Sequence, residues 1–435
     1  MPHTSSFPFI KIGFSILSLL FLMTINLSDS FFLLLSIINS TISIWCLFSD
    51  HERPYTIHKL VNLFILLFFV YANAIQYANG SIVSSLWLSF SKNEYQTFQI
   101  IVLFILLLFN LCYYITIKTH VFAIKHNEYT VNQTALILVA TAASLIVLRH
   151  YRANISELFI RGFEGEANIV LFENSSSSLL FEKFLRVFPI ISFIIASLSN
   201  TSRSVKVYLF ILAIITVFPT GLARNAIIMY WLPCILIHFH FFDRKNVFVV
   251  LLLIGILVLF PFMESFRRFN GHITTEFISL NYLDTMSYDA SQEFMAAIKM
   301  HAITYGKQLL GALLFFVPRR LWPSKPIGSG AFIAQSQFAF SNISMPFWGE
   351  GYVNFGWFGI LLFTLLLSFF AARMDYVFWE TKKNNIINVS SGYYYIILGA
   401  VLFIMRGDLM SSFAYLAGVL VAFSLITKVT TKKIL

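Results

Sequence analysis

Charged residues are scarce in this 435-residue sequence. Asp, Glu, Lys and Arg together make up 11% of it, whereas soluble domains contain roughly a quarter. Hydrophobic residues make up 58% and aromatic residues 17%. So few charges cannot cover a globular surface in contact with water, which excludes a soluble globular protein. The composition predicts an all-α polytopic membrane protein.

Cysteine is equally scarce. Its three positions, Cys46, Cys112 and Cys234, all lie inside apolar runs. A disulfide framework or a cysteine metal site needs paired or clustered cysteines, so this placement argues against both.

Familiar catalytic and nucleotide-binding motifs are missing as well. The sequence has no HExxH helix, no glycine-rich nucleotide loop and no recognisable Ser-His-Asp pattern. Asp284, Asp289, His272 and His301 are too scattered to predict a metal site. We therefore predict no metal, no cofactor and no nucleic-acid partner.

Long apolar runs, in contrast, are abundant. Their lengths predict about twelve transmembrane helices within one integral-membrane domain over residues 1–435. The runs fall near residues 10–27, 31–48, 59–78, 98–117, 133–149, 184–199, 205–220, 222–242, 246–263, 356–373, 392–406 and 409–427. Pro189 and Pro219 are expected to kink or end helices.

Lysine and arginine are distributed unevenly between the connecting segments. With the N-terminus in the cytoplasm, every cytoplasmic segment is short and basic, and the last contains Lys428, Lys432 and Lys433. Short basic segments set orientation, whereas long loops carry little weight. We therefore predict that both termini are cytoplasmic and that two longer loops, 149–186 and 264–355, lie on the outer face.

The two outer loops differ in character. Residues 149–186 form the smaller loop and mix acidic with basic side chains, which is typical of a solvated surface. Residues 264–355 form the large loop between the ninth and tenth predicted helices. Within it, the pattern at 289–301 predicts a short helix. Residues 307–317 are apolar but too short to span a bilayer, so we expect them at the membrane interface.

The most unusual stretch of the large loop is 318–330. Arg319, Arg320 and Lys325 occur there with no acid among them. Its prolines and glycines exclude a regular helix. Such a loop can bind phosphate, because Arg and Lys supply charged donors and glycine lets backbone N–H groups approach closely. A cationic loop can equally contact lipid headgroups, and both interpretations stay open.

Two more arginine sites lie at predicted membrane edges. Arg224 follows the turn at 219–221 and opens the next helix, where a cation adds to the positive end of the helix dipole and favours an anion site. Arg267 and Arg268 follow the ninth predicted helix directly. The alternative for each site is an arginine anchored to lipid headgroups.

Glu350 is the candidate acid–base residue. It lies between two glycines in the aromatic segment 347–356, just before the tenth predicted helix. Partial desolvation would raise its pKa and suit it to general-base work. Aromatic side chains there, such as Tyr352, could stack on sugar rings, although an interfacial aromatic belt explains them as well.

The turn between the last two predicted helices contributes a further cation on the outer face. Arg406 lies two positions before Asp408 in the sequence. A salt bridge between these two side chains is the alternative to a role for Arg406 in binding substrate phosphate.

The segment Phe315–Pro326 resembles the outer-loop signature of O-antigen polymerases and related oligosaccharide repeat-unit polymerases (Wzy-type). The segment 350–356 is similar to the same family, and so is the isolated Arg224. Arg319 and Gly330 fit the Arg-x10-Gly spacing of polymerase loops.

This resemblance implies a GT-C-like glycosyltransferase of the bacterial inner membrane, active on its periplasmic face. Such an enzyme transfers a growing glycan from undecaprenyl pyrophosphate to an incoming lipid-linked repeat unit. The implied partners are these lipid-linked oligosaccharides, inner-membrane lipid and a chain-length regulator. The matching motifs occupy only a small share of the chain, and 149–186 contains no good second copy of the Arg-x10-Gly spacing.

The resemblance and the charge pattern together predict roles within the site. Arg224 and Arg319 would bind the two phosphates and stabilise the negative charge that builds on the leaving group. Glu350 would orient or deprotonate the acceptor hydroxyl. The supporting substrate-binding residues would be Arg320, Lys325, Arg406, Arg267, Arg268, Gly330 and Tyr352.

Two other functions share this architecture. An O-antigen ligase would use the same donor but transfer the glycan to lipid A core. The family implies a histidine in the large loop for that reaction, and His272 and His301 lie in no recognisable context. A lipid-linked oligosaccharide flippase would also fit twelve spans. A transporter, however, is expected to have charges in mid-helix, whereas here they cluster at the outer membrane edge.

Overall fold

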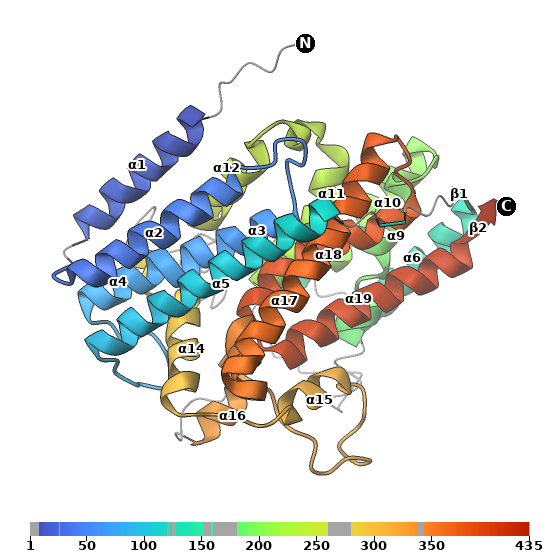
Figure 1. The fold of residues 1–435 in the computed structure, drawn as a ribbon. Helices are drawn as coiled ribbons and strands as arrows, with labels where there is room; N and C mark the ends of the chain where they lie inside the picture. The colour runs from blue at the N-terminus through green and yellow to red at the C-terminus, as the bar shows by residue number, and fades with distance from the viewer. Residues whose placement is uncertain are drawn as a thin grey trace.

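The computed structural model describes residues 8–25, 27–119, 122–123, 128–151, 158–159, 181–259, 280–336 and 343–434, and these are mostly helical (Figure 1). The α-helices of the first half are α1 (Pro8–Thr24), α2 (Ser30–Leu47), α3 (Ile57–Phe64), α4 (Ala72–Asn79), α5 (Lys92–Thr119), α6 (Gln133–His150), α9 (Phe188–Ser197), α10 (Arg203–Thr216), α11 (Arg224–His238) and α12 (Val247–Ile254). Those of the second half are α14 (Ala290–Lys299), α15 (Lys307–Leu313), α16 (Ser329–Ser336), α17 (Phe347–Lys383), α18 (Gly392–Arg406) and α19 (Leu409–Thr430).

Shorter elements link these helices. The π-helical segments are η1 (Ile65–Tyr71), η2 (Phe181–Leu185) and η5 (Gly255–Leu259). The 3₁₀ turns are η3 (Pro219–Gly221), η4 (His240–Asp243), η6 (Leu280–Leu283), η7 (Met286–Tyr288) and η8 (Val389–Ser391). The strands β1 (Glu128–Val131) and β2 (Thr431–Ile434) pair antiparallel, with Glu128 opposite Ile434.

Eight helices in the described ranges are long and apolar enough to cross a membrane, which fits an all-α polytopic membrane protein. They are Ser30–Leu47, Ile57–Asn79, Lys92–Thr119, Gln133–His150, Arg203–Gly221, Phe347–Lys383, Val389–Arg406 and Leu409–Thr430. Four of the twelve predicted runs instead contain shorter apolar helices, at Phe9–Thr24, Phe188–Ser197, Ala226–His238 and Val247–Val258.

The helices pack around two hydrophobic cores. α17 packs against α3, α5, α14, α15 and α18, which places it in the middle of the larger core. α6, α9, α10, α11 and α19 surround the smaller one. α18 contributes to both, because Tyr395 belongs to the larger core and Ile396 to the smaller. The two cores therefore form one continuous bundle.

The two ends of the bundle differ in the elements that lie on them. The loop face is the end where α14, α15 and α16 lie (Figure 1). The strand face is the opposite end, where β1 and β2 pair. The segment 280–336 of the predicted large loop is thus gathered on one end of the bundle.

Buried polar side chains join the helices inside the bundle. Gln99 Nε2 donates to the Phe69 carbonyl at 2.8 Å and to Asn73 Oδ1 at 2.9 Å, and Asn39 Nδ2 donates to Gln99 Oε1 at 2.8 Å. All three side chains are fully buried. Because the Phe69 carbonyl belongs to the π-helical segment η1, this network also fixes the irregular part of its helix.

At the strand face, Asp375 of α17 performs a similar role. It is fully buried and accepts hydrogen bonds from the backbone N–H groups of Ile57 and His58, at 2.9 and 3.2 Å. The hydroxyls of Tyr113 and Tyr394 donate to it at 3.0 and 2.7 Å. Asp375 thereby satisfies the free N–H groups at the start of α3, which ties α3 to α17.

Two elements of the large loop match their predicted positions, and one begins earlier than predicted. α14 lies within the predicted helix 289–301, and α15 lies within the apolar segment 307–317. α17 begins at Phe347 rather than near 356. Its backbone leaves the helical conformation at Phe355 and at Gly356, which has φ +61° and ψ −143°. Glu350 therefore lies in a helical turn ahead of a kink.

Candidate functional site

Three stretches that are far apart in the sequence meet at the loop face around Glu350. Its side chain is 1% exposed. The Ser329 hydroxyl donates to Glu350 Oε2 at 2.5 Å, and the backbone N–H of Leu409 donates to Oε1 at 2.8 Å. The carboxylate thus joins the end of the basic stretch 318–330 to the start of α19.

Asp408 lies beside Glu350 and completes an acid pair. It precedes α19 and accepts hydrogen bonds from the N–H groups of Gly330 and Met410, both at 3.0 Å. Burial raises the pKa of Asp408, and the backbone N–H groups that donate to it oppose this shift. The acid pair, Glu350 and Asp408, therefore binds the two consecutive residues Ser329 and Gly330.

The glycines of the basic stretch lie so close to neighbouring atoms that a side chain would not fit. An ideal Cβ on Gly330 would lie 2.2 Å from the Ile343 carbonyl oxygen. One on Gly328 would lie 2.5 Å from Asp408 Oδ2. Neither position has room for a side chain, so the Gly330 of the Arg-x10-Gly spacing has a steric reason in this fold.

Arg319 and Lys325 bind the carbonyl groups of their own loop. Arg319 Nη1 donates to the Lys325 carbonyl at 2.7 Å. Lys325 Nζ donates to the carbonyls of Phe315 and Val317, at 2.5 and 2.9 Å. Burial, together with Arg319 nearby, lowers the pKa of Lys325. The side chains of Arg319 and Arg320 are exposed, so the loop presents positive charge outward.

The loop lies beside the first turns of α19. The rings of Phe315 and Phe413 contact each other edge to face, with centroids 6.2 Å apart. Leu313, Phe316 and Leu321 remain 49%, 67% and 77% exposed. Because α19 is long and apolar enough to cross a membrane, these exposed apolar side chains lie next to a membrane-spanning segment.

Arg406 has a different partner from the one considered in the sequence. Its Nη2 atom lies 2.9 Å from Asp289 Oδ1 and donates to the Met286 carbonyl, while its Nε atom donates to the Ser287 carbonyl. The ion pair therefore involves Asp289 of the large loop rather than Asp408. Arg406 fixes the segment before α14 onto the end of α18.

A second buried glutamate, which sequence reasoning missed, lies in α14. Glu293 is fully buried, and the Ser84 hydroxyl donates to its Oε1 at 2.8 Å. Burial, and then the nearby Asp289, raise the pKa of Glu293 well above its ordinary value. The amphipathic pattern of 290–299 predicts a helix. The hydrogen bond between Glu293 and Ser84 could not be inferred, because the two residues are far apart in the sequence.

The remaining predicted site residues lie elsewhere or cannot be assigned a side-chain position. Tyr352 is 2% exposed and packs inside the larger core. Arg224 begins α11, three residues after the end of the 3₁₀ turn η3. Arg267 and Arg268 lie outside the described residues. The structure thus brings Glu350, the basic stretch and the start of α19 together.

No protein-family model, curated protein or solved structure matches this chain. Within the ranges that the structure describes, no group of three or more His, Cys, Asp or Glu side chains is arranged to hold a metal ion.

Proposed function

We propose that the protein polymerises lipid-linked oligosaccharide repeat units for O-antigen or a related surface polysaccharide. It would be a GT-C-like glycosyltransferase of the bacterial inner membrane, with the loop face in the periplasm. One observation carries the proposal. Glu350, in the segment 350–356 that resembles repeat-unit polymerases, accepts a hydrogen bond from Ser329, which lies three residues after the other such segment, 315–326.

The proposed reaction is a glycosyl transfer. The acceptor hydroxyl oxygen bonds to the anomeric carbon of the donor glycan, while the bond from that carbon to undecaprenyl pyrophosphate breaks. The hydroxyl proton passes to a base, and undecaprenyl pyrophosphate leaves with the bonding electron pair. The donor is already activated by its pyrophosphate, so the residues needed are cations for the leaving group and a carboxylate for the proton.

Three arginines, Arg224, Arg319 and Arg320, supply the cations in this proposal. Arg319 would bind one phosphate and Arg224 the other, with Arg320 adding to the positive field. Lys325 would act through the loop, because its ammonium group donates to the carbonyls of Phe315 and Val317.

Glu350 would receive or orient the acceptor hydroxyl. In the structure, the Ser329 hydroxyl donates to Glu350 Oε2 at 2.5 Å. A sugar hydroxyl is the same kind of donor, so it could replace Ser329 at this oxygen when the loop moves aside. The second oxygen would stay on the backbone N–H of Leu409, which keeps the carboxylate oriented.

The test is a lipopolysaccharide gel from a strain that lacks the gene and is complemented with variants. Wild type should restore a ladder of repeats, whereas Glu350→Gln and Arg319→Ala should each give core plus a single repeat. Ser329→Ala should retain the ladder, because it removes only the competing donor. Lys428→Ala, at the strand-face end of α19, is the matched cation control and should behave as wild type.

Other gel patterns would contradict specific parts of the proposal. Loss of every O-antigen band in the uncomplemented strain, the single repeat included, would indicate a ligase or a flippase. A full ladder from Glu350→Gln would remove Glu350 as the base while leaving the polymerase assignment intact. Membrane protein levels measured by immunoblot would separate lost activity from lost folding.

A further inference from the structure

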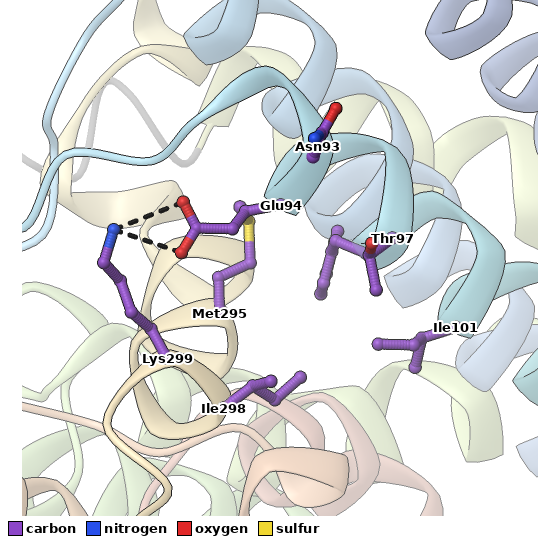
Figure 2. Close-up of a pocket in the computed structure, with 8 residues that line it drawn as sticks. Asn93, Glu94, Thr97, Ile101, Met295, Ile298 and Lys299 are labelled. Carbon is purple, nitrogen blue, oxygen red and sulfur yellow. Dashed lines mark hydrogen bonds and ion pairs between the residues drawn. The ribbon is translucent and has the colours of Figure 1, made fainter.

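A groove lies on the loop face between α5 and α14, apart from the acid pair. Its volume is about 160 Å³. Figure 2 shows side chains from the two helices facing a common space, with Thr97 and Ile101 on one side and Met295 and Ile298 on the other. Apolar cavities of about this size accept a small hydrocarbon such as benzene. The groove can therefore hold part of one hydrocarbon chain.

The polar groups of the groove lie at one end. Lys299 Nζ is 3.1 Å from Glu94 Oε1, and both side chains are about one-third exposed, at 37% and 34% (Figure 2). Asn93 is exposed beside them. Ile101, about two turns further along α5, is apolar and buried. The groove is thus amphipathic along its length, with one cation and one anion at its polar end.

The groove continues a stripe of exposed apolar side chains on α5. These side chains are 47–60% exposed and recur at three- and four-residue intervals: Ile100, Phe104, Leu107, Leu111 and Ile115. Such spacing places them on one face of the helix. In a helix that crosses a membrane this face contacts lipid, so a lipid chain lying along it reaches Thr97 and the groove.

We propose that this groove binds one acyl chain of a zwitterionic phospholipid with an amine headgroup, such as phosphatidylethanolamine. The headgroup lies at the polar end, where Lys299 faces the phosphate and Glu94 faces the ammonium group. The site is independent of the proposed glycosyl transfer.

Charge complementarity selects this lipid over anionic ones. Glu94 and Lys299 carry opposite charges, so the polar end is close to neutral. The phosphate of phosphatidylglycerol or undecaprenyl phosphate could also pair with Lys299, but these lipids have no ammonium group to compensate the charge of Glu94. The groove therefore differs in preference from the exposed arginine loop, which favours anions.

The test measures the apparent Tm of the delipidated protein in detergent as one lipid is added. Phosphatidylethanolamine should raise the apparent Tm of wild type by at least about 3 °C, and phosphatidylglycerol or undecaprenyl phosphate should raise it less. Ile298→Trp and Thr97→Phe fill the groove and should abolish the increase. Leu107→Trp, on the lipid-facing stripe but outside the groove, is the matched control and should respond as wild type.

A charge variant tests the headgroup assignment separately. Glu94→Gln removes the carboxylate partner of Lys299 and leaves a net positive charge at the polar end, so the lipid preference of the variant should move from phosphatidylethanolamine to phosphatidylglycerol. The proposal is overturned if undecaprenyl phosphate or phosphatidylglycerol stabilises wild type as much as phosphatidylethanolamine does. It is also overturned if both groove-filling variants respond as wild type. Because Thr97 is exposed, Thr97→Phe keeps the test valid should Ile298→Trp fail to fold.

Discussion

At the scale of single residues, Asp408 connects the basic stretch 318–330 to the start of α19. It accepts the Gly330 N–H, and it also stands at the start of α19. Only 8% of the residue is exposed to solvent. An ionised carboxylate in this buried position is poorly solvated, so the protonation state of Asp408 affects how firmly the loop is held.

This burial predicts a pH dependence of stability. The pKa of Asp408 is raised in the folded chain, so the folded chain binds the proton of this carboxyl group more tightly than the unfolded chain does. Its contribution to stability is complete below the unfolded-state pKa of about 3.9 and is lost as pH rises through the folded pKa. We expect the apparent Tm to fall as pH rises through this window, and to fall less for Asp408→Asn.

Wild type and Asp408→Asn are compared by the slope of the apparent Tm with pH and not by the apparent Tm at one pH. The substitution itself changes the apparent Tm, because Asn keeps only one acceptor oxygen for the N–H groups of Gly330 and Met410. Asp284→Asn is the matched control. Asp284 Oδ2 accepts from side chains of Asn79 and Ser81, away from the acid pair. An Asp408→Asn protein with the same slope as wild type would contradict the assignment.

At the scale of elements, the kink in α17 separates the Glu350 turn from the membrane-spanning part of the helix. Gly356 has φ +61° and ψ −143°, a region that residues with a Cβ rarely adopt. An added Cβ would also lie 3.1 Å from Ile303 Cδ1. The kink lets the first turn of α17 point its carboxylate at α19 while the rest of the helix packs in the core.

Gly356→Ala should therefore destabilise the protein by about 1–3 kcal/mol. The change would be measured as the free energy of unfolding in mixed detergent and denaturant. Gly255→Ala is the control, because Gly255 has φ −58° and an added Cβ there would meet nothing within 4 Å. Equal stabilities for the two variants would mean that the kink is not strained by a side chain.

The elements were more predictable from the sequence than the site. Apolar runs and amphipathic spacing are local properties of the sequence, so eight spans and the helix α14 could be predicted from them. The early start of α17 could not, because the aromatic and glycine-rich segment 347–356 has weak helix propensity and is fixed by packing. The ion pair of Arg406 with Asp289 could not be predicted either, because Asp289 is far away in the sequence and only the fold brings the two residues together.

The same contrast holds for the site. The residue types and the Arg-x10-Gly spacing predicted roles for Glu350, Arg319 and Gly330, and the structure brings Glu350 and Gly330 into one cluster. The sequence did not predict the part of Asp408 in that cluster. It also gave no sign that Arg319 and Lys325 bind their own loop, because backbone carbonyls have no signature in a sequence.

At the scale of the whole molecule, the bundle has two chemically different ends. The proposed orientation makes Ser324 of the basic stretch periplasmic and Lys432 of β2 cytoplasmic. With the three native cysteines replaced by serine, Ser324→Cys should react with a membrane-impermeant maleimide on intact spheroplasts. Lys432→Cys should react only after the membrane is opened. The reverse pattern would show that the orientation is opposite to the proposed one. Labelling of both cysteines in intact spheroplasts would contradict the placement of Ser324 and Lys432 on opposite sides of the membrane.

The pairing of β1 with β2 has a consequence for biosynthesis. β2 completes a sheet whose other strand, Glu128–Val131, is made some three hundred residues earlier. Spans enter the membrane in order as the ribosome makes them, so β1 has no partner strand until the helices from α6 to α19 have been synthesised. The strand face therefore closes only after most of the bundle has been made.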